Sequence, residues 1–150
     1  MCIRDSAKAG YIEVPSRLEE QSWGVSGPFV GWSHHRWLID VGEREIEFTV
    51  KLHSIHSRPT QQFPPGFWES LAPAERVQTL WWQDGFAVRE RLMFEAAESE
   101  RYLAGFVEQE LAKRPDFRRS APGAGEREAA PPGQWRQGLS RLVRRVSPRR

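Results

Sequence analysis

The chain has 150 residues, of which 39% are hydrophobic and 28% charged, with a formal net charge of +2; this is enough apolar material for one globular domain with its own core. No apolar run approaches the roughly 18 residues that would span a bilayer, and the first residues lack the pattern of a secretory signal, so we expect a cytoplasmic protein. The single cysteine, Cys2, excludes an intramolecular disulfide and a thiolate metal cluster.

The two ends of the chain differ in character from its middle. The opening MCIRDS resembles a translated sequencing adapter, so we expect residues 1–6 to be a non-native leader and residues 7–114 to form the globular domain. Residues 1–113 carry 17 acidic and 12 basic side chains, a net charge of −5, whereas residues 114–150 carry ten arginines and three acidic side chains, a net charge of +7. A basic tail on an acidic body predicts that the tail seeks an anionic surface, and the body is the nearest one.

A β-hairpin is predicted over residues 37–52. The stretch REIEFTVKL alternates strictly between polar and apolar side chains, and WLIDV before it has the same two-residue spacing. Gly42 between them allows the chain to reverse, and a two-residue turn there places Ile39 opposite Ile46. A further strand, expected at residues 11–14, is the candidate for a third strand of the same sheet.

Two helices are predicted after the hairpin. Pro73 suits a first helical turn, and the apolar residues that follow it recur at helical spacing as far as residue 83. From Phe86 onward, apolar side chains occupy one arc of a helical wheel and charged side chains the opposite arc, which predicts a long amphipathic helix that ends before Pro115. Because a hairpin alone is marginal in water, we predict an α+β fold in which this helix covers its apolar face. The alternative is that the apolar stripe pairs with a second copy of the chain in a homodimer.

The C-terminal part separates into a linker and a tail. Residues 115–134 are rich in Pro, Gly, Ala and charge, the composition of a flexible, disordered linker, and residues 135–150 form a basic amphipathic segment. Its apolar edge consists of Trp135, Leu139, Leu142 and Val146, and its basic side of Arg141, Arg144 and Arg145. A helix this short is marginal in water, so we expect it to form on docking. The candidate surfaces are a protein groove, the chain's own acidic body, an anionic membrane surface and, less favoured, nucleic acid.

No catalytic or cofactor motif stands out in the sequence. All four histidines lie in or beside the predicted hairpin, and His34 and His53, which share one face, are the candidate metal ligands. Their diagonal positions place the two Cβ atoms about 7–8 Å apart, so they need a third ligand and are better interpreted as ordinary strand histidines. We therefore expect a small non-catalytic protein-interaction module without a cofactor, of the adaptor, regulator or immunity-protein kind. The alternatives are a metal-dependent enzyme built on these histidines and a nucleic-acid-binding protein that uses the basic tail.

Overall fold

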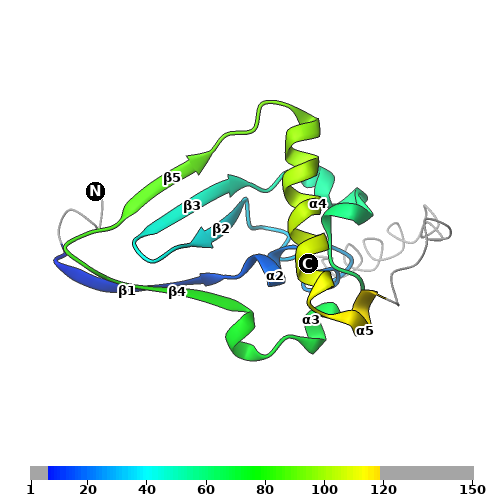
Figure 1. Cartoon of the computed structure of the whole chain (residues 1–150), viewed down its shortest axis with the longest axis horizontal. Helices are drawn as coiled ribbons and strands as arrows, with labels where there is room; N and C mark the ends of the chain where they lie inside the picture. Colours follow the sequence, from blue (N-terminus) through cyan, green and yellow to red (C-terminus); the bar gives the residue numbers. More distant parts are fainter. Residues whose placement is uncertain (1–6, 119–150) are drawn as a thin grey trace, which may run out of the picture.

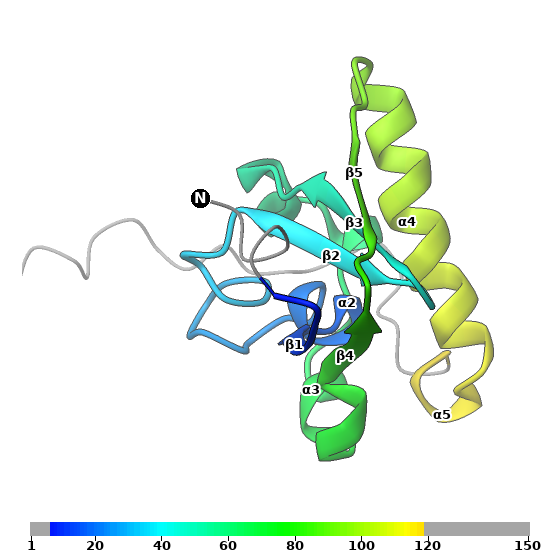
Figure 2. The ribbon, with the colours of Figure 1, turned by 90° about the vertical axis from the view of Figure 1, so that its left-hand side faces the viewer.

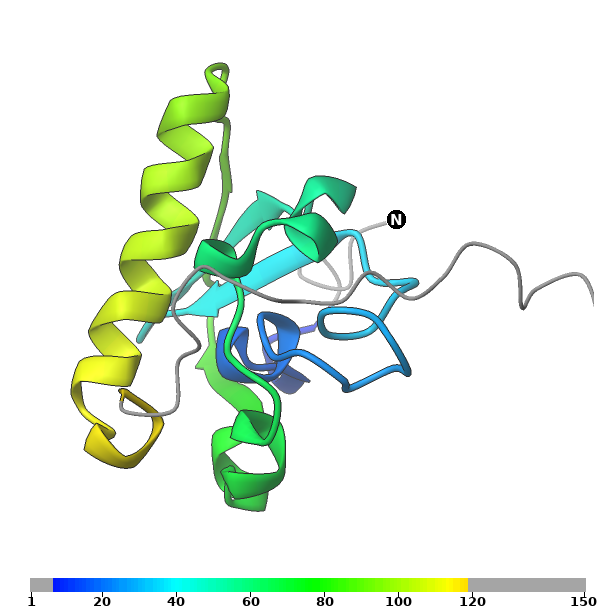
Figure 3. The same ribbon diagram turned by 90° about the vertical axis from the view of Figure 1, so that its right-hand side faces the viewer.

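The computed structural model describes residues 7–118, which form an α+β fold with two small sheets and one long helix (Figure 1). The strands are β1 (Ala9–Pro15), β2 (Trp37–Val41), β3 (Glu45–Val50), β4 (Val77–Gln83) and β5 (Ala87–Arg91). The helices are α2 (Arg17–Glu20), α3 (Phe67–Ser70), α4 (Ala96–Ala112) and α5 (Pro115–Arg118), with 3₁₀ turns at η1 (His53–Ser57), η2 (Pro59–Gln61) and η3 (Pro73–Glu75). In both side views α4 lies along one side of the strands (Figures 2 and 3).

The β2–β3 hairpin is confirmed, but its register differs from the predicted one by two residues. Val41 pairs with Ile46 and Ile39 with Phe48. The Gly42 N–H donates to the Glu45 carbonyl at 2.9 Å, so residues 43–44 form the two-residue turn, and not residues 42–43 as predicted. The predicted pairing of Ile39 with Ile46 is therefore wrong. Moving a two-residue turn along the chain by one position changes the partner of every strand residue by two. A shift of two residues keeps every side chain on its predicted face.

The third strand of this sheet comes from a segment predicted to be helical. β5 lies parallel to β3, whereas β1, the expected third strand, pairs antiparallel with β4 in a separate two-stranded ribbon. The prediction of a helix over residues 77–83 is wrong because VQTLWWQ also alternates: Leu80 and Trp82 are buried, and Trp81 between them is exposed. Its β-branched and aromatic residues favour a strand once a partner such as β1 is available.

The long helix α4 is confirmed but is shorter than predicted, since its expected first turns form β5. It begins at Ala96 rather than Phe86, and it ends at Ala112, before Pro115 as expected. Its buried residues recur at four-residue intervals and are Ser99, Leu103 and Val107. Residues at this spacing lie on one face of a helix, which is the face that α4 packs against the rest of the molecule.

The hairpin and the helix pack against different partners from those predicted. The apolar face of the hairpin meets the β1–β4 ribbon, where Ile46 clusters with Leu80 and Trp82. The apolar side of α4 packs on the segment between β3 and β4, where Val107 belongs to the same cluster as Phe67. The prediction that the helix covers the hairpin's apolar face is thus not confirmed. The alternation of a strand shows that its apolar face must be buried, but it does not identify the element that packs against that face.

A glutamine side chain joins the two sheets. β2 is an edge strand, and Gln78 of β4 reaches its free backbone groups. The Oε1 atom of Gln78 accepts a hydrogen bond from the Val41 N–H at 3.1 Å, and its Nε2 atom donates to the Ile39 carbonyl at 2.8 Å. The carboxamide thereby satisfies two polar groups that the sheet leaves unpaired.

We expect Gln78→Met to lower the free energy of unfolding by about 1–3 kcal/mol, because two partly buried backbone groups lose their partners. Gln83→Met is the matched control at an exposed position of the same strand, where a change of no more than about 0.5 kcal/mol is expected. Urea denaturation of both variants measures the difference. Equal losses would contradict a specific role for Gln78.

The described residues end inside the predicted linker. Its first four residues form α5, and the ring of Phe117 lies 5.3 Å from that of Phe67, so this turn belongs to the packed body. Outside the described residues lie the rest of the linker, residues 1–6, and the predicted docking face of the tail, Trp135, Leu139, Leu142, Val146, Arg141, Arg144 and Arg145. Between residues 7 and 118, none of the helices is both long and apolar enough to cross a membrane.

Candidate functional site

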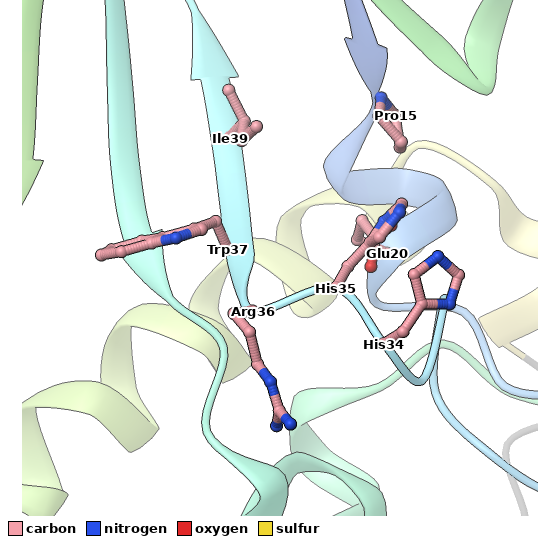
Figure 4. A pocket seen from close by; sticks show the side chains of 7 residues that line it. All are labelled: Pro15, Glu20, His34, His35, Arg36, Trp37 and Ile39. Carbon is pink, nitrogen blue, oxygen red and sulfur yellow. The ribbon is translucent and has the colours of Figure 1, made fainter.

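A cleft of about 400 Å³ lies between the end of β1 and the start of β2 (Figure 4). Side chains from both strands, from α2 and from the loop before β2 line it: Pro15, Glu20, His34, His35, Arg36, Trp37 and Ile39. Figure 4 shows the two imidazoles on the side of Glu20, and Trp37 and Ile39 along β2. The lining therefore combines an apolar wall with a set of ionisable groups.

Glu20 is the buried charge of this site. Only 1% of the residue is exposed, and its Oε2 atom accepts a hydrogen bond from the Lys51 Nζ at 2.6 Å, while Oε1 lies 2.6 Å from the Nδ1 of His35. Lys51, also buried, donates in addition to the Trp32 carbonyl at 3.2 Å. Burial lowers the pKa of Lys51, although the hydrogen bond and the charge of Glu20 act in the opposite direction. A carboxylate removed from water requires partners of this kind.

The contact with Glu20 orients the imidazole of His35. When Nδ1 donates its proton to the carboxylate, Nε2 carries the lone pair, and it forms no hydrogen bond with any residue of the described chain. The side chain is 34% exposed, so this nitrogen can exchange a proton or a hydrogen bond with a molecule in the cleft. Among residues 7–118, no hydroxyl or thiol side chain hydrogen-bonds to His35, so a nucleophile–base pair is not formed there.

The position of Glu20 depends on how α2 is held. Ser16 is the N-cap of this short helix: its Oγ atom accepts a hydrogen bond from the Glu19 N–H at 3.2 Å and donates to the Glu75 carbonyl at 2.6 Å. A cap of this type satisfies an otherwise unpaired N–H group, and the second bond ties the start of α2 to the segment before β4. At Gly31 (φ +57°), a Cβ atom would lie 2.4 Å from the Glu20 carbonyl oxygen, so this position requires glycine.

Arg17 connects the same helix to α4. Its Nη1 atom donates to the Oδ2 of Asp40 at 3.1 Å and to the Tyr102 hydroxyl at 2.9 Å, while Nε and Nη2 donate to the Gln21 Oε1. The guanidinium also lies 4.0 Å from the centre of the Phe106 ring. Arg17 is 5% exposed, and its charge is matched by this set of contacts. Helix α2 is therefore fixed between the hairpin and α4.

The predicted metal candidates do not lie on the strands. His34 precedes β2 and packs against His35, with ring centroids 4.5 Å apart; His53 lies in η1 next to His56, at 5.8 Å. The expectation that they share a strand face is wrong, because β2 begins only at Trp37 and the chain turns into η1 after β3. In residues 7–118, no group of three or more His, Cys, Asp or Glu is arranged to hold a metal ion.

Sequence reasoning missed Arg17, Glu20 and Lys51, which organise the site. Residues 7–28 show no sustained period, and the alternation of β3 assigned Lys51 to a solvent-facing side. Neither a protein-family model, nor a curated protein, nor a solved structure matches this chain. The function of the cleft must therefore be argued from its geometry.

Lys51→Met removes the cation from a buried carboxylate, and we expect it to lower the free energy of unfolding by about 3–5 kcal/mol. Combining it with Glu20→Gln, which keeps the side-chain shape and removes the charge, recovers part of this loss. Urea denaturation of the two single variants and the double variant yields the coupling energy, expected to be at least about 1 kcal/mol. Additive effects would contradict a direct pairing of the two charges.

His56 makes the stability of the body dependent on pH. Its Nδ1 atom accepts the Val30 N–H at 3.1 Å, and burial lowers its pKa below the ordinary value of 6.5, with smaller contributions from the charges of Lys51 and His53. Because the unfolded chain binds this proton more readily, the stability that neutral His56 provides is present above about pH 6.5 and is lost as the pH falls toward the lowered value. We expect His56→Asn, which retains an acceptor, to lose less stability than the wild type between pH 7.5 and 5.5 in urea denaturation. Identical pH profiles would contradict this assignment.

Proposed function

We propose that the protein is a small non-catalytic interaction module that binds a protein partner through the outer face of the β1–β4 ribbon. The observation that supports this most directly is Trp81, which is 76% exposed and pairs across the strands with Tyr11, their ring centroids 4.5 Å apart. Tyrosine and tryptophan are the side chains most often found as energetic centres of protein interfaces. A pair of them held side by side on a rigid ribbon loses little conformational entropy on binding.

The surroundings of this aromatic pair favour protein over nucleic acid. The exposed neighbours on the same ribbon are small, polar or acidic: Ala9, Glu13, Thr79 and Gln83. Glu13 accepts a hydrogen bond from the Tyr11 hydroxyl at 2.6 Å, which places a negative charge beside the rings. Such a surface repels phosphate, whereas single-stranded nucleic acid binds where aromatic rings are flanked by cations.

A second apolar surface supports an interaction role. In the segment between β5 and α4, Phe94 is 88% and Leu92 is 56% exposed, and all five residues of β5 are exposed. Free soluble proteins seldom leave large apolar side chains grouped in this way without a use for them.

We also propose that the basic segment 135–150 acts as a docking peptide, either for the partner or for the acidic body of the same chain. Its arginines and its Trp-Leu-Leu-Val edge support this, because a protein groove can bury the apolar edge, whereas the phosphates of a nucleic acid attract only the arginines. An anionic membrane surface would attract both the apolar edge and the arginines of this segment, so membrane binding is one alternative to a protein partner. A homodimer is the other alternative.

Placing a photoreactive benzoylphenylalanine at position 81 of the full chain tests the proposed surface. Irradiation in cells is expected to yield a discrete cross-linked product, and the same residue at position 108, on an exposed turn of α4, is expected to yield none. A self-adduct would identify the partner as a second copy. With the purified partner, Trp81→Ser should weaken binding by about 30-fold or more, while changing the free energy of unfolding by no more than about 1 kcal/mol. Unchanged affinity, or equal products at both positions, would overturn the proposal.

A further inference from the structure

We infer that the cleft between β1 and β2 is a binding site for a small monoanion, namely a carboxylate attached to an aromatic or other apolar group. This inference is independent of the proposed partner surface, because it rests on the residues that line the cleft: Arg36, Trp37 and Ile39 at β2, and Pro15, His34 and His35 across from them (Figure 4). A concave site with an apolar wall and a few converging polar groups is the usual form of a small-molecule site.

The charges around the cleft match one negative charge. Glu20 and Lys51 form an ion pair at 2.6 Å and neutralise one another. The remaining permanent charge is the guanidinium of Arg36, which forms no ion pair with any residue in the described part of the chain. Its Nη1 atom hydrogen-bonds to the His53 Nε2, and its Nε and Nη2 groups make no hydrogen bond within residues 7–118. A planar guanidinium binds a carboxylate through two parallel hydrogen bonds. A phosphate dianion would meet the Glu20 carboxylate with too little positive charge to offset the repulsion.

The imidazoles define where further hydrogen bonds form. His34 makes ring contacts and no hydrogen bond within residues 7–118, so its N–H is available to a carboxylate oxygen. His35, oriented by Glu20, presents Nε2 as an acceptor. A ligand that carries an N–H or O–H donor next to its carboxylate would therefore satisfy Arg36 and both imidazoles at once.

The apolar wall is rigid enough to select a ring. The indole of Trp37 packs edge-on against Phe48, with ring centroids 5.9 Å apart, and remains 38% exposed. With Ile39 it gives the β2 side of the cleft an apolar lining, and Pro15 lies across from them on the side of the imidazoles (Figure 4). The same ligand chemistry occurs in a free N-acylated aromatic amino acid and at the C-terminus of a peptide with an aromatic last residue.

The test is an NMR titration of the ¹⁵N-labelled full chain with N-acetylphenylalanine, read at the tryptophan indole and histidine imidazole signals. Saturable shifts are expected with a Kd on the order of 1 mM, typical of a ligand of this size. N-acetylphenylalaninamide, which lacks the charge, and N-acetylglycine, which lacks the ring, are expected to bind at least about tenfold more weakly. Acetyl-Ala-Ala-Phe separates the two sources: tighter binding than N-acetylphenylalanine indicates a peptide C-terminus, and equal or weaker binding indicates a free acid.

Two arginine variants provide the matched comparison. Arg36→Gln is expected to weaken binding of N-acetylphenylalanine at least about tenfold, whereas Arg44→Gln, which removes the same charge from the exposed hairpin turn, should change it by less than about twofold. The backbone bond from the Lys51 N–H to the Arg36 carbonyl survives the substitution, and His34→Gln at an exposed position is a second variant expected to weaken binding. The proposal is overturned if no saturable shift occurs up to about 20 mM, if the neutral amide binds equally well, or if Arg44→Gln weakens binding as much as Arg36→Gln.

Discussion

One buried ion pair, between Glu20 and Lys51, fixes the positions of α2, the end of the hairpin and the loop before β2 relative to one another. It joins α2 to the residue after β3, and through His35 and the Trp32 carbonyl it also holds the loop that leads into β2. Removing two charges from water is costly, so such a pair contributes little net stability; its effect is to specify one arrangement, because neither charge tolerates the loss of the other. Gly31 packs against both partners so closely that the loop and the ion pair fit only together.

The β2–β3 hairpin and α4 were the parts of the fold open to prediction, since each has a regular pattern of apolar side chains. The hairpin followed from alternation, and α4 ends where Pro115 requires. The segment around Trp81 and Trp82 was misassigned because its apolar residues satisfy both a helical and a strand period, and only the presence of β1 as a partner decides between them. The parallel pairing of β5 with β3 joins segments about forty residues apart in the chain, and no local pattern encodes it.

Much less of the candidate site could be predicted from the sequence. Arg17 and Glu20 lie in a helix of four residues, which is too short to produce a periodic signal. Lys51 lies on the polar side of an alternating strand pattern, which predicts exposure, yet α2 covers that side and the lysine is buried. His34 was predicted as a candidate metal ligand because it was expected to share a strand face with His53. It instead lines the cleft together with His35 and Arg36, its neighbours in the loop before β2.

The carboxamide of Gln78 has a consequence for the long-term integrity of the protein. It hydrogen-bonds to the free edge of β2 as an additional strand would, so a strand of another chain cannot pair with these backbone groups. Deamidation to glutamate would replace the donating nitrogen with an oxygen that faces the Ile39 carbonyl, and the two would repel one another. Slow deamidation at this single side chain would thus expose the backbone groups of the β2 edge and favour aggregation.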